Sequence, residues 1–294
     1  MLEVKLCGMT LKNPLVLASG ILGSYASSLN VIAENAGAVV TKSVGVEVRE
    51  GYPNPTVINL PHGILNAVGL ASPGAERFSE ELRNFSKASK LIVSLFASSP
   101  QDFSKLVKHF EMADAFELNL SCPHVRDVGL TVGNDAELVK EIVKAVKKET
   151  AKPVFPKLSA ASDYIEVAKA AEEGGADGVV AINTLKGMAI DIATKKPILS
   201  NISGGWSGEA IKPVAMKVVW DLYEELEIPV IASGGATTWK DVIEFMLAGA
   251  KAVQIGSAVY YSYRIFYSLK ESLIAYLRKE RTNIEDFIGL AHKK

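Results

Sequence analysis

A cysteine stands among other polar groups in the run Asn-Leu-Ser-Cys-Pro at residues 119–123. The stretch from Ala115 to Asn119 reads as a buried strand, and the proline that follows prevents further strand pairing. An amide, a hydroxyl and the Cys122 thiol therefore meet at the carboxyl end of a strand, where parallel α/β proteins bind ligands. A lone thiol is also typical of a small core residue, but its polar neighbours favour a chemical role.

Two lysines interrupt apolar runs in the same way. Lys42 follows Val-Val-Thr, and Lys157 follows Val-Phe-Pro. Burying an ammonium group is costly unless it is paired. Each lysine therefore implies an anionic partner, a reactive amine, or a strand that ends earlier than its apolar pattern suggests.

Glycines follow two late apolar runs, as Gly234-Gly235 and as Gly256-Ser257. Glycine lets backbone N–H groups approach a phosphate closely, and the N-terminus of the next helix adds a favourable dipole. Either motif alone could be a tight turn. Their occurrence after consecutive strands predicts a phosphorylated ligand, over which the stretch 203–208 could close.

These groups can act together only if the ends of the strands converge, and a loose repeat in the sequence predicts that they do. A helical stretch ends in Gly-Ala and a short β-branched strand follows, most clearly near residues 36–40, 174–179 and 248–253. Repeats of this kind indicate βα units in series, and their number fits an α/β protein with a (β/α)8 TIM barrel. The predicted strands are Leu15–Ala18, Val39–Thr41, Leu91–Leu95, Ala115–Leu118, Val154–Pro156, Gly178–Ile182, Val230–Ala232 and Ala252–Ile255. The predicted helices are Glu76–Ala88, Asp102–Met112, Asp135–Thr150, Tyr164–Glu173, Pro213–Leu226 and Lys240–Ala248.

Three further segments complete this organisation. Glu3–Lys12 predicts a β-hairpin that closes the bottom of the barrel, with Cys7 in a structural role. Val44–Ala71 and Leu185–Gly208 are longer than the other connections and are interpreted as inserted active-site loops. No linker or change of composition is visible, so residues 1–294 are expected to form a single domain.

The composition narrows the function classes. The chain is 48% hydrophobic and 22% charged, with a formal net charge of −1, which argues against disorder and against nucleic acid as a partner. No apolar run is long enough to span a membrane. Two distant cysteines suit a reducing compartment, so a cytoplasmic protein is expected. The cysteines are too few for an iron–sulfur cluster and the histidines have no metal-ligand spacing, so no metal site is predicted.

Several motifs resemble the class 1 dihydroorotate dehydrogenases. They are the run at residues 119–123, Asn-Ala-Val-Gly-Leu at 66–70, Ile-Asn-Thr at 182–184 and Gly-Trp-Ser-Gly at 205–208. The runs at 65–70 and 208–215 resemble the B-type subclass. The resemblance implies an FMN-binding barrel that oxidises (S)-dihydroorotate to orotate in de novo pyrimidine biosynthesis.

The resemblance also implies roles for individual residues. Cys122 matches the catalytic base that takes the proton from C5 of dihydroorotate, while the hydride from C6 passes to FMN. The residues that match substrate contacts are Lys42, Asn66, Ala67, Val68, Gly69, Leu70, Asn119, Asn183 and Thr184. Those that match FMN contacts are Ser19, Lys42, Ser43, Asn119, Lys157, Ile182, Gly208, Gly234, Gly235, Gly256 and Ser257.

The chain departs from the family pattern at two positions: His124 stands where an Asn is usual, and Ser94 stands where B-type relatives often have an Asn. B-type relatives work with a second subunit that carries FAD and a 2Fe–2S cluster and passes electrons to NAD. The resemblance therefore implies such a partner, in a heterotetramer of two copies of each subunit around a homodimeric core.

Three other functions remain compatible with the residues. A flavin barrel similar to dihydropyrimidine dehydrogenase would share most ring contacts. A phosphate-binding lyase or aldolase could use Lys157 as a Schiff-base amine. A barrel kept only as a binding subunit is disfavoured by the joint presence of Cys122, both lysines and both glycine motifs.

Overall fold

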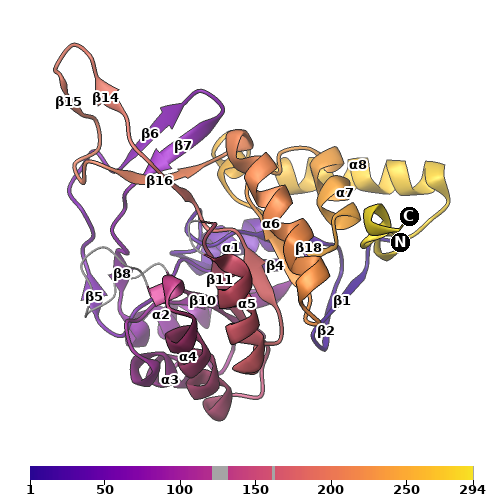
Figure 1. The fold of residues 1–294 in the computed structure, drawn as a ribbon, viewed down its shortest axis with the longest axis horizontal. Coiled ribbons are helices and arrows are strands. Elements are labelled where there is room, and N and C mark those ends of the chain that lie inside the picture. The colour runs from indigo at the N-terminus through magenta and orange to yellow at the C-terminus, as the bar shows by residue number, and fades with distance from the viewer. Residues whose placement is uncertain (121–131, 161–162, 294) are drawn as a thin grey trace.

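A closed barrel of eight parallel strands forms the centre of the molecule (Figure 1). The computed structural model describes residues 1–120, 132–160 and 163–293. Strand β18 pairs with β3 and so closes the ring, which confirms the predicted TIM barrel. All eight predicted strands are present, with ends shifted by at most two residues. They are β3 (Leu15–Leu17), β4 (Ala38–Val40), β9 (Lys90–Leu95), β10 (Ala115–Asn119), β11 (Val154–Leu158), β12 (Val179–Ala181), β17 (Val230–Ser233) and β18 (Ala250–Ile255).

Helices alternate with these strands along the chain and surround the barrel (Figure 1). Tyr164–Glu173 has the predicted bounds, and each end of three other helices differs from the prediction by one residue. The helices are α1 (Ala26–Ala33), α2 (Ala75–Leu82), α3 (Pro100–Lys108), α4 (Ala136–Glu149), α5 (Tyr164–Glu173), α6 (Lys212–Glu225), α7 (Trp239–Leu247) and α8 (Ile265–Glu280).

Two helix predictions were too long at the carboxyl end. Helix α2 stops at Leu82 because the chain turns there, so that the Phe85 N–H donates to the Leu82 carbonyl and Lys87 adopts a left-handed φ of 57°. Helix α3 stops at Lys108 for a similar reason, since the His109 N–H caps the last turn. Helices α1 and α8 were not predicted.

The N-terminal hairpin fills the bottom of the barrel, as predicted. Strands β1 (Val4–Leu6) and β2 (Met9–Leu11) pair antiparallel around a turn at Cys7 and Gly8. Their apolar side chains form one cluster with barrel residues that include Phe155, while the larger core lies between the strands and the helices. This end of the barrel is therefore closed, and only the carboxyl ends of the strands are open to a ligand.

The two inserted segments border the mouth of the barrel as predicted, and short strands form within them. Strands β6 (Val57–Leu60) and β7 (Gly63–Asn66) of the first segment join β13 (Leu185–Gly187) and β16 (Gly204–Ser207) of the second in one antiparallel sheet, in the order β13-β16-β7-β6. Short pairs flank it: β5 (Val48–Arg49) with β8 (Ser72–Pro73), and β14 (Ile190–Asp191) with β15 (Lys196–Pro197). The barrel mouth is thus bordered by a second sheet rather than by irregular loops.

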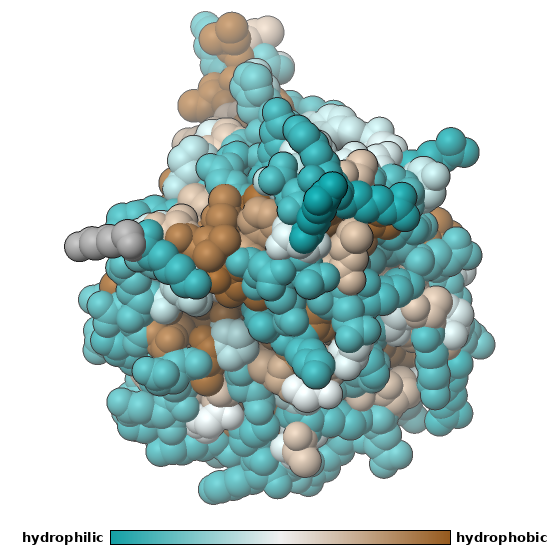
Figure 2. Space-filling model, turned by 90° about the vertical axis from the view of Figure 1, so that its right-hand side faces the viewer, coloured by the Kyte–Doolittle hydropathy of each residue, from teal (hydrophilic) through white to brown (hydrophobic). Residues whose placement is uncertain are grey.

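The hairpin of β14 and β15 projects from the body of the molecule (Figure 1). Hydrophobic residues gather at its tip, and Figure 2 shows them at the top of the space-filling view. Met188, Ile190 and Ile192 have 49%, 58% and 90% of their surface exposed. No helix in the described ranges is both long and apolar enough to cross a membrane.

Candidate active site

A pocket of about 450 Å³ lies where the barrel mouth meets the second sheet. Its volume is in the range typical of small-molecule and cofactor sites. Every site residue predicted from the sequence that falls within the described ranges lines it. Cys122, the predicted base, and His124 lie outside the described residues. The predicted residues that line the pocket are Ser19, Lys42, Ser43, Asn66, Ala67, Val68, Gly69, Leu70, Asn119, Lys157, Ile182, Asn183, Thr184, Gly208, Gly234, Gly235, Gly256 and Ser257.

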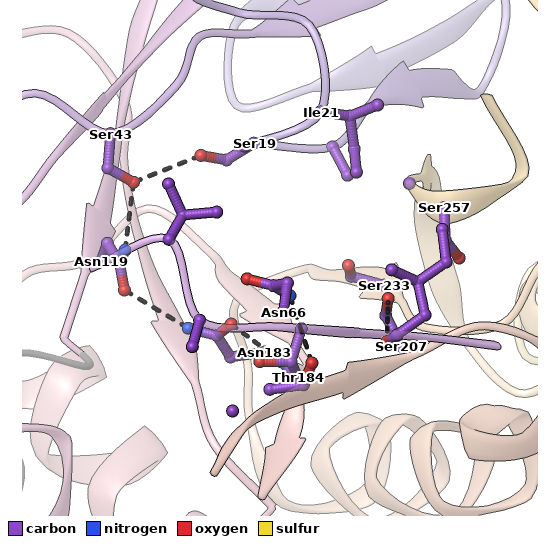
Figure 3. Close-up of a pocket in the computed structure, with 18 of the residues that line it drawn as sticks. Ser19, Ile21, Ser43, Asn66, Asn119, Asn183, Thr184, Ser207, Ser233 and Ser257 are labelled. Carbon is purple, nitrogen blue, oxygen red and sulfur yellow. Dashed lines mark hydrogen bonds between the residues drawn. The ribbon is translucent and has the colours of Figure 1, made fainter. Parts of the chain in front are cut away.

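A chain of amides and hydroxyls crosses one wall of the pocket (Figure 3). The Thr184 N–H donates to Asn183 Oδ1 at 2.8 Å, and Asn183 Nδ2 donates to Asn119 Oδ1 at 3.3 Å. Asn119 Nδ2 in turn donates to Ser43 Oγ at 3.1 Å. Each amide is therefore held in one orientation by its neighbour, and its remaining bonding capacity has a fixed direction.

The Ser43 hydroxyl ties this wall to β9 and to the segment that follows β3. Its Oγ lies 2.9 Å from Ser94 Oγ. It also lies 3.3 Å from Ser19 Oγ, a contact that Figure 3 shows. Ser94 is fully buried behind the pocket, and its hydroxyl supports Ser43.

The second sheet contributes Asn66 from the opposite side. Residue 66 ends β7 opposite Gly205 of β16, and Asn66 Nδ2 donates to the Gly205 carbonyl at 3.2 Å. A Cβ at position 205 would come within 2.1 Å of Thr184 Oγ1. Only glycine therefore lets the sheet approach the mouth of the barrel at this point.

Lys42 supplies an uncompensated cation. It follows β4 and lines the pocket, and burial lowers the pKa of its ammonium below the ordinary value. Within the part of the chain that the structure describes, its side chain has neither an ion pair nor a hydrogen bond. A buried ammonium without a partner favours the binding of an anion.

Lys157 has a different environment. Strand β11 continues to Leu158, so the lysine lies inside the strand and the predicted end at Pro156 was wrong. Its Nζ donates to Gln254 Oε1 at 2.9 Å and lies 3.5 Å from Glu117 Oε1. The expected anionic partner of this lysine is therefore Glu117, which is 1% exposed.

The glycine motifs lie side by side because β17 and β18 are neighbours in the barrel. Gly235 has a φ of 85°, and a Cβ there would lie 2.8 Å from the Lys212 backbone nitrogen, so a side chain is excluded. Helix α7 begins four residues later, at Trp239, with Thr238 and Asp241 in a capping box. The two turns thus bring glycine backbone to one side of the pocket, an arrangement that suits a phosphate.

Sequence reasoning missed Glu117 and Gln254. Glu117 was treated only as part of an apolar strand, and Gln254 only as part of the last one. The signal was present, since a buried strand rarely carries a charged or amide side chain without a partner. Arg49, which lies 5.7 Å above the Phe96 ring and also lines the pocket, was missed as well.

None of the histidines that the structure describes lines the pocket. His62 is exposed in the β6–β7 turn, 3.9 Å from Glu209, and His292 stacks on Trp220 with ring centroids 3.6 Å apart. His109 is exposed at the end of α3. The described residues contain no group of three or more His, Cys, Asp or Glu that could hold a metal ion.

Comparisons with known proteins agree with this geometry. The sequence model of the dihydroorotate dehydrogenase family matches residues 1–277. The chain is 57% identical to the catalytic subunit of dihydroorotate dehydrogenase B (NAD(+)) from Archaeoglobus fulgidus over 295 residues, covering 99% of both chains. It is 51% identical to the protein of that name from Pyrococcus abyssi, covering 100% of both chains. The corresponding protein of Methanocaldococcus jannaschii is 45% identical, with 100% of this chain and 99% of the relative covered. Together the pocket and these similarities show that the chain belongs to the dihydroorotate dehydrogenase family.

Proposed function

We propose that this chain is the FMN-binding catalytic subunit of a B-type dihydroorotate dehydrogenase, which oxidises (S)-dihydroorotate to orotate in pyrimidine biosynthesis. The observation that carries the proposal is the convergence of three groups on one pocket. These are the ordered amides of Asn119 and Asn183, the cation of Lys42, which has no partner within the described residues, and the glycine turns after β17 and β18. The names of the relatives support it, since they describe catalytic subunits of this enzyme.

The residues present fit FMN. The turns at Gly234-Gly235 and Gly256-Ser257 would hold its phosphate with backbone amides, and Lys157 would lie beside its ring. Ser19, Ser43, Ile182 and Gly208 line the intervening surface. When bound, the flavin supplies the acceptor for the hydride that leaves C6 of the substrate. The protein supplies the binding, the orientation and the charge around it.

The substrate's chemistry matches the remaining groups. Dihydroorotate is an anionic ring with two amide edges, which needs a cation and groups that both donate and accept. Lys42 would bind the carboxylate, and the Asn66–Leu70 segment with Asn119, Asn183 and Thr184 would bind the ring edges. Cys122, whose position lies outside the described residues, would take the proton from C5 as the general base.

The electrons leave through a second protein in this proposal. The name "catalytic subunit" of the relatives implies a partner. We propose that the partner carries FAD and a 2Fe–2S cluster and reduces NAD, in a heterotetramer built on a homodimer of this chain. We further propose that residues 1–294 act as one domain and that the enzyme is cytoplasmic.

Lys157 bears on the lyase alternative. A Schiff-base mechanism needs a free amine that attacks a carbonyl. Lys157 Nζ instead donates to Gln254 and faces Glu117. This pairing supports a role as a fixed cation and leaves no specific observation in favour of the lyase.

An anaerobic titration tests the function. The purified chain is reconstituted with FMN, and dihydroorotate is added without an electron acceptor while the flavin absorbance near 450 nm is followed. We expect stoichiometric bleaching and one orotate per flavin. Bleaching by dihydrouracil but not by dihydroorotate would favour the dihydropyrimidine dehydrogenase alternative, and a chain that binds no FMN would contradict the proposal.

The role of Cys122 is tested by substitution. Cys122→Ala should retain FMN and lose several orders of magnitude in the rate of bleaching, because the C5 proton then has no base. Cys7→Ala, which removes the other thiol at the closed end of the barrel, is the matched control and should bleach at the wild-type rate. Equal rates in the two variants would show that Cys122 is not the base.

A further inference from the structure

A buried triad of Lys157, Gln254 and Glu117 lies under the pocket. The three residues come from β11, β18 and β10 and are 8%, 2% and 1% exposed. Gln254 Nε2 donates to Glu117 Oε2 at 2.6 Å, while Gln254 Oε1 accepts from Lys157 Nζ at 2.9 Å. The amide therefore bridges the carboxylate and the ammonium.

Lys157 and Glu117 form an ion pair without a direct hydrogen bond between them. Lys157 Nζ and Glu117 Oε1 are 3.5 Å apart, and this oxygen has no hydrogen-bond partner within the described residues. A buried carboxylate oxygen normally accepts a hydrogen bond, and an ammonium beside it normally moves to donate one. Since Gln254 holds one proton of Lys157 and one oxygen of Glu117, its side chain keeps the two charges apart.

Both charged residues also face the cavity. Lys157 and Glu117 are among the residues that line the pocket, whereas Gln254 lies behind them. A ligand in the pocket therefore experiences a positive charge and a negative charge whose spacing is set by Gln254. In a site shielded from water, such charges act on a ligand more strongly than they would at the surface.

We propose that Glu117 and Gln254 are positioning residues for Lys157, and that the triad sets the electron affinity of the cofactor in the pocket. This inference rests on the proposed FMN site. Reduction places negative charge on the flavin ring, which Lys157 favours and Glu117 opposes. Glu117 thus lowers the reduction potential of the flavin, and Gln254 raises it by preventing the carboxylate from neutralising the ammonium.

Substitutions of Glu117 and Gln254 should shift the midpoint potential of bound FMN in opposite directions. Glu117→Gln keeps the size of the side chain and its bond to Gln254 but removes the negative charge. The midpoint potential of bound FMN, measured against reference dyes, should rise by about 30 mV, which is a tenfold change for a two-electron couple. Gln254→Met removes the bridging amide and lets Lys157 donate directly to Glu117. The potential should then fall by about 15 mV, which is roughly a threefold change in the equilibrium constant for reduction.

A second readout does not depend on turnover. Sulfite adds to oxidised flavins and leaves negative charge on the ring, so its dissociation constant should fall about tenfold in Glu117→Gln and rise about threefold in Gln254→Met. Glu173→Gln is the control, because it removes one negative charge from a carboxylate that is exposed on α5 and paired with Lys140. It should leave both quantities at the wild-type values.

The outcomes separate this inference from the proposed function. Shifts of opposite sign support the triad. Potentials equal to those of Glu173→Gln, or shifts in the same direction in both variants, overturn it. If Glu117→Gln does not fold, Gln254→Met decides alone, and an unchanged potential rejects the inference. A wild-type chain that binds no FMN overturns both proposals, whereas bound FMN that dihydroorotate does not reduce contradicts only the function.

Discussion

The two ends of the barrel carry the same kinds of polar residue and use them differently. At the closed end, Lys12 Nζ donates to the carbonyls of Ala33, Glu34 and Ala88 at 2.7, 2.8 and 2.9 Å. At the open end, Lys42 has no partner among the described residues. The first lysine satisfies carbonyls at the end of α1 and in a neighbouring turn, whereas the second is the one that we propose binds the ligand.

The thiol at the closed end, like Lys12, donates to a backbone carbonyl within the protein. Cys7 Sγ donates to the Asp177 carbonyl at 2.9 Å, and burial raises the pKa of the thiol to about 12. A thiol held neutral in this way is a poor nucleophile and a poor base. Unused bonding capacity in a partly buried place, rather than residue type, therefore distinguishes the functional end from the structural end.

The largest expected effect is that of Lys42→Met on ligand binding. Loss of the cation should weaken orotate binding about a thousandfold, or about 4 kcal/mol, because a buried carboxylate then has no counter-charge. The stability of the chain should not fall, since no contact within the described residues is lost. Orotate binding is measured from the perturbation of the flavin spectrum, and urea unfolding gives the stability.

The pH dependence sharpens this prediction. Burial lowers the pKa of Lys42, so its charge is lost at a lower pH than that of an ordinary lysine. Wild-type affinity for orotate should therefore decline as the pH rises through this lowered pKa. Lys42→Met should show no such decline, and an equal decline in both proteins would assign the titration to another group.

The next effect is that of Asn183→Asp on turnover. The substitution preserves shape but places a carboxylate against Asn119 Oδ1, which must then turn and lose its bond to Ser43. We expect kcat/KM for dihydroorotate to fall about a hundredfold, or about 2.7 kcal/mol. Asn84→Asp at an exposed position is the control and should be unaffected. A wild-type value for Asn183→Asp would show that the amide chain does not position substrate.

At the closed end, Lys12→Met should reduce stability without reducing activity. Three carbonyls lose a charged donor, and we expect the free energy of unfolding to fall by about 2 kcal/mol. Lys5→Met removes an exposed lysine from the same hairpin and should change it by less than about 0.5 kcal/mol. Urea unfolding of both variants makes the comparison, and equal stabilities would mean that the three bonds contribute nothing.

The smallest effect concerns Cys7 at alkaline pH. The pKa of this thiol is raised from 9.0 to about 12, so above pH 9 the unfolded chain ionises it and the folded chain does not. Ionisation of the unfolded state lowers stability as the pH rises from 8 to 10, by about 1.4 kcal/mol for this one group. The loss of unfolding free energy over that range should therefore be smaller in Cys7→Ala by this amount.

Local patterns were sufficient to predict the barrel and to point to residues that line one pocket. Apolar runs of three to five residues, three of them preceded by a Gly-Ala turn, identified all eight strands. Motifs that match the family pointed to residues which the structure brings to one pocket. Helix α8 was not predicted, because the glycine turn at 256–257 before it was interpreted only as a phosphate site.

Pairings between distant segments could not be predicted. The second sheet joins strands of only three or four residues, mostly half-exposed, so none has a strong pattern of its own. The bond between Gln254 and Glu117 joins residues 137 positions apart, which no local periodicity encodes. Such features follow from the closure of the barrel and become visible only once the strands are in register.

The most direct test of the difference between the two ends compares Lys42→Met with Lys12→Met. In each variant, the rate at which dihydroorotate reduces the flavin is measured by rapid mixing. We predict that Lys42→Met reduces its flavin at least a hundredfold more slowly at a fixed substrate concentration below saturation, while Lys12→Met keeps the wild-type rate in spite of its lower stability. Equal rates in the two variants, whether both normal or both slow, would contradict the proposal that Lys42 at the open end binds the ligand.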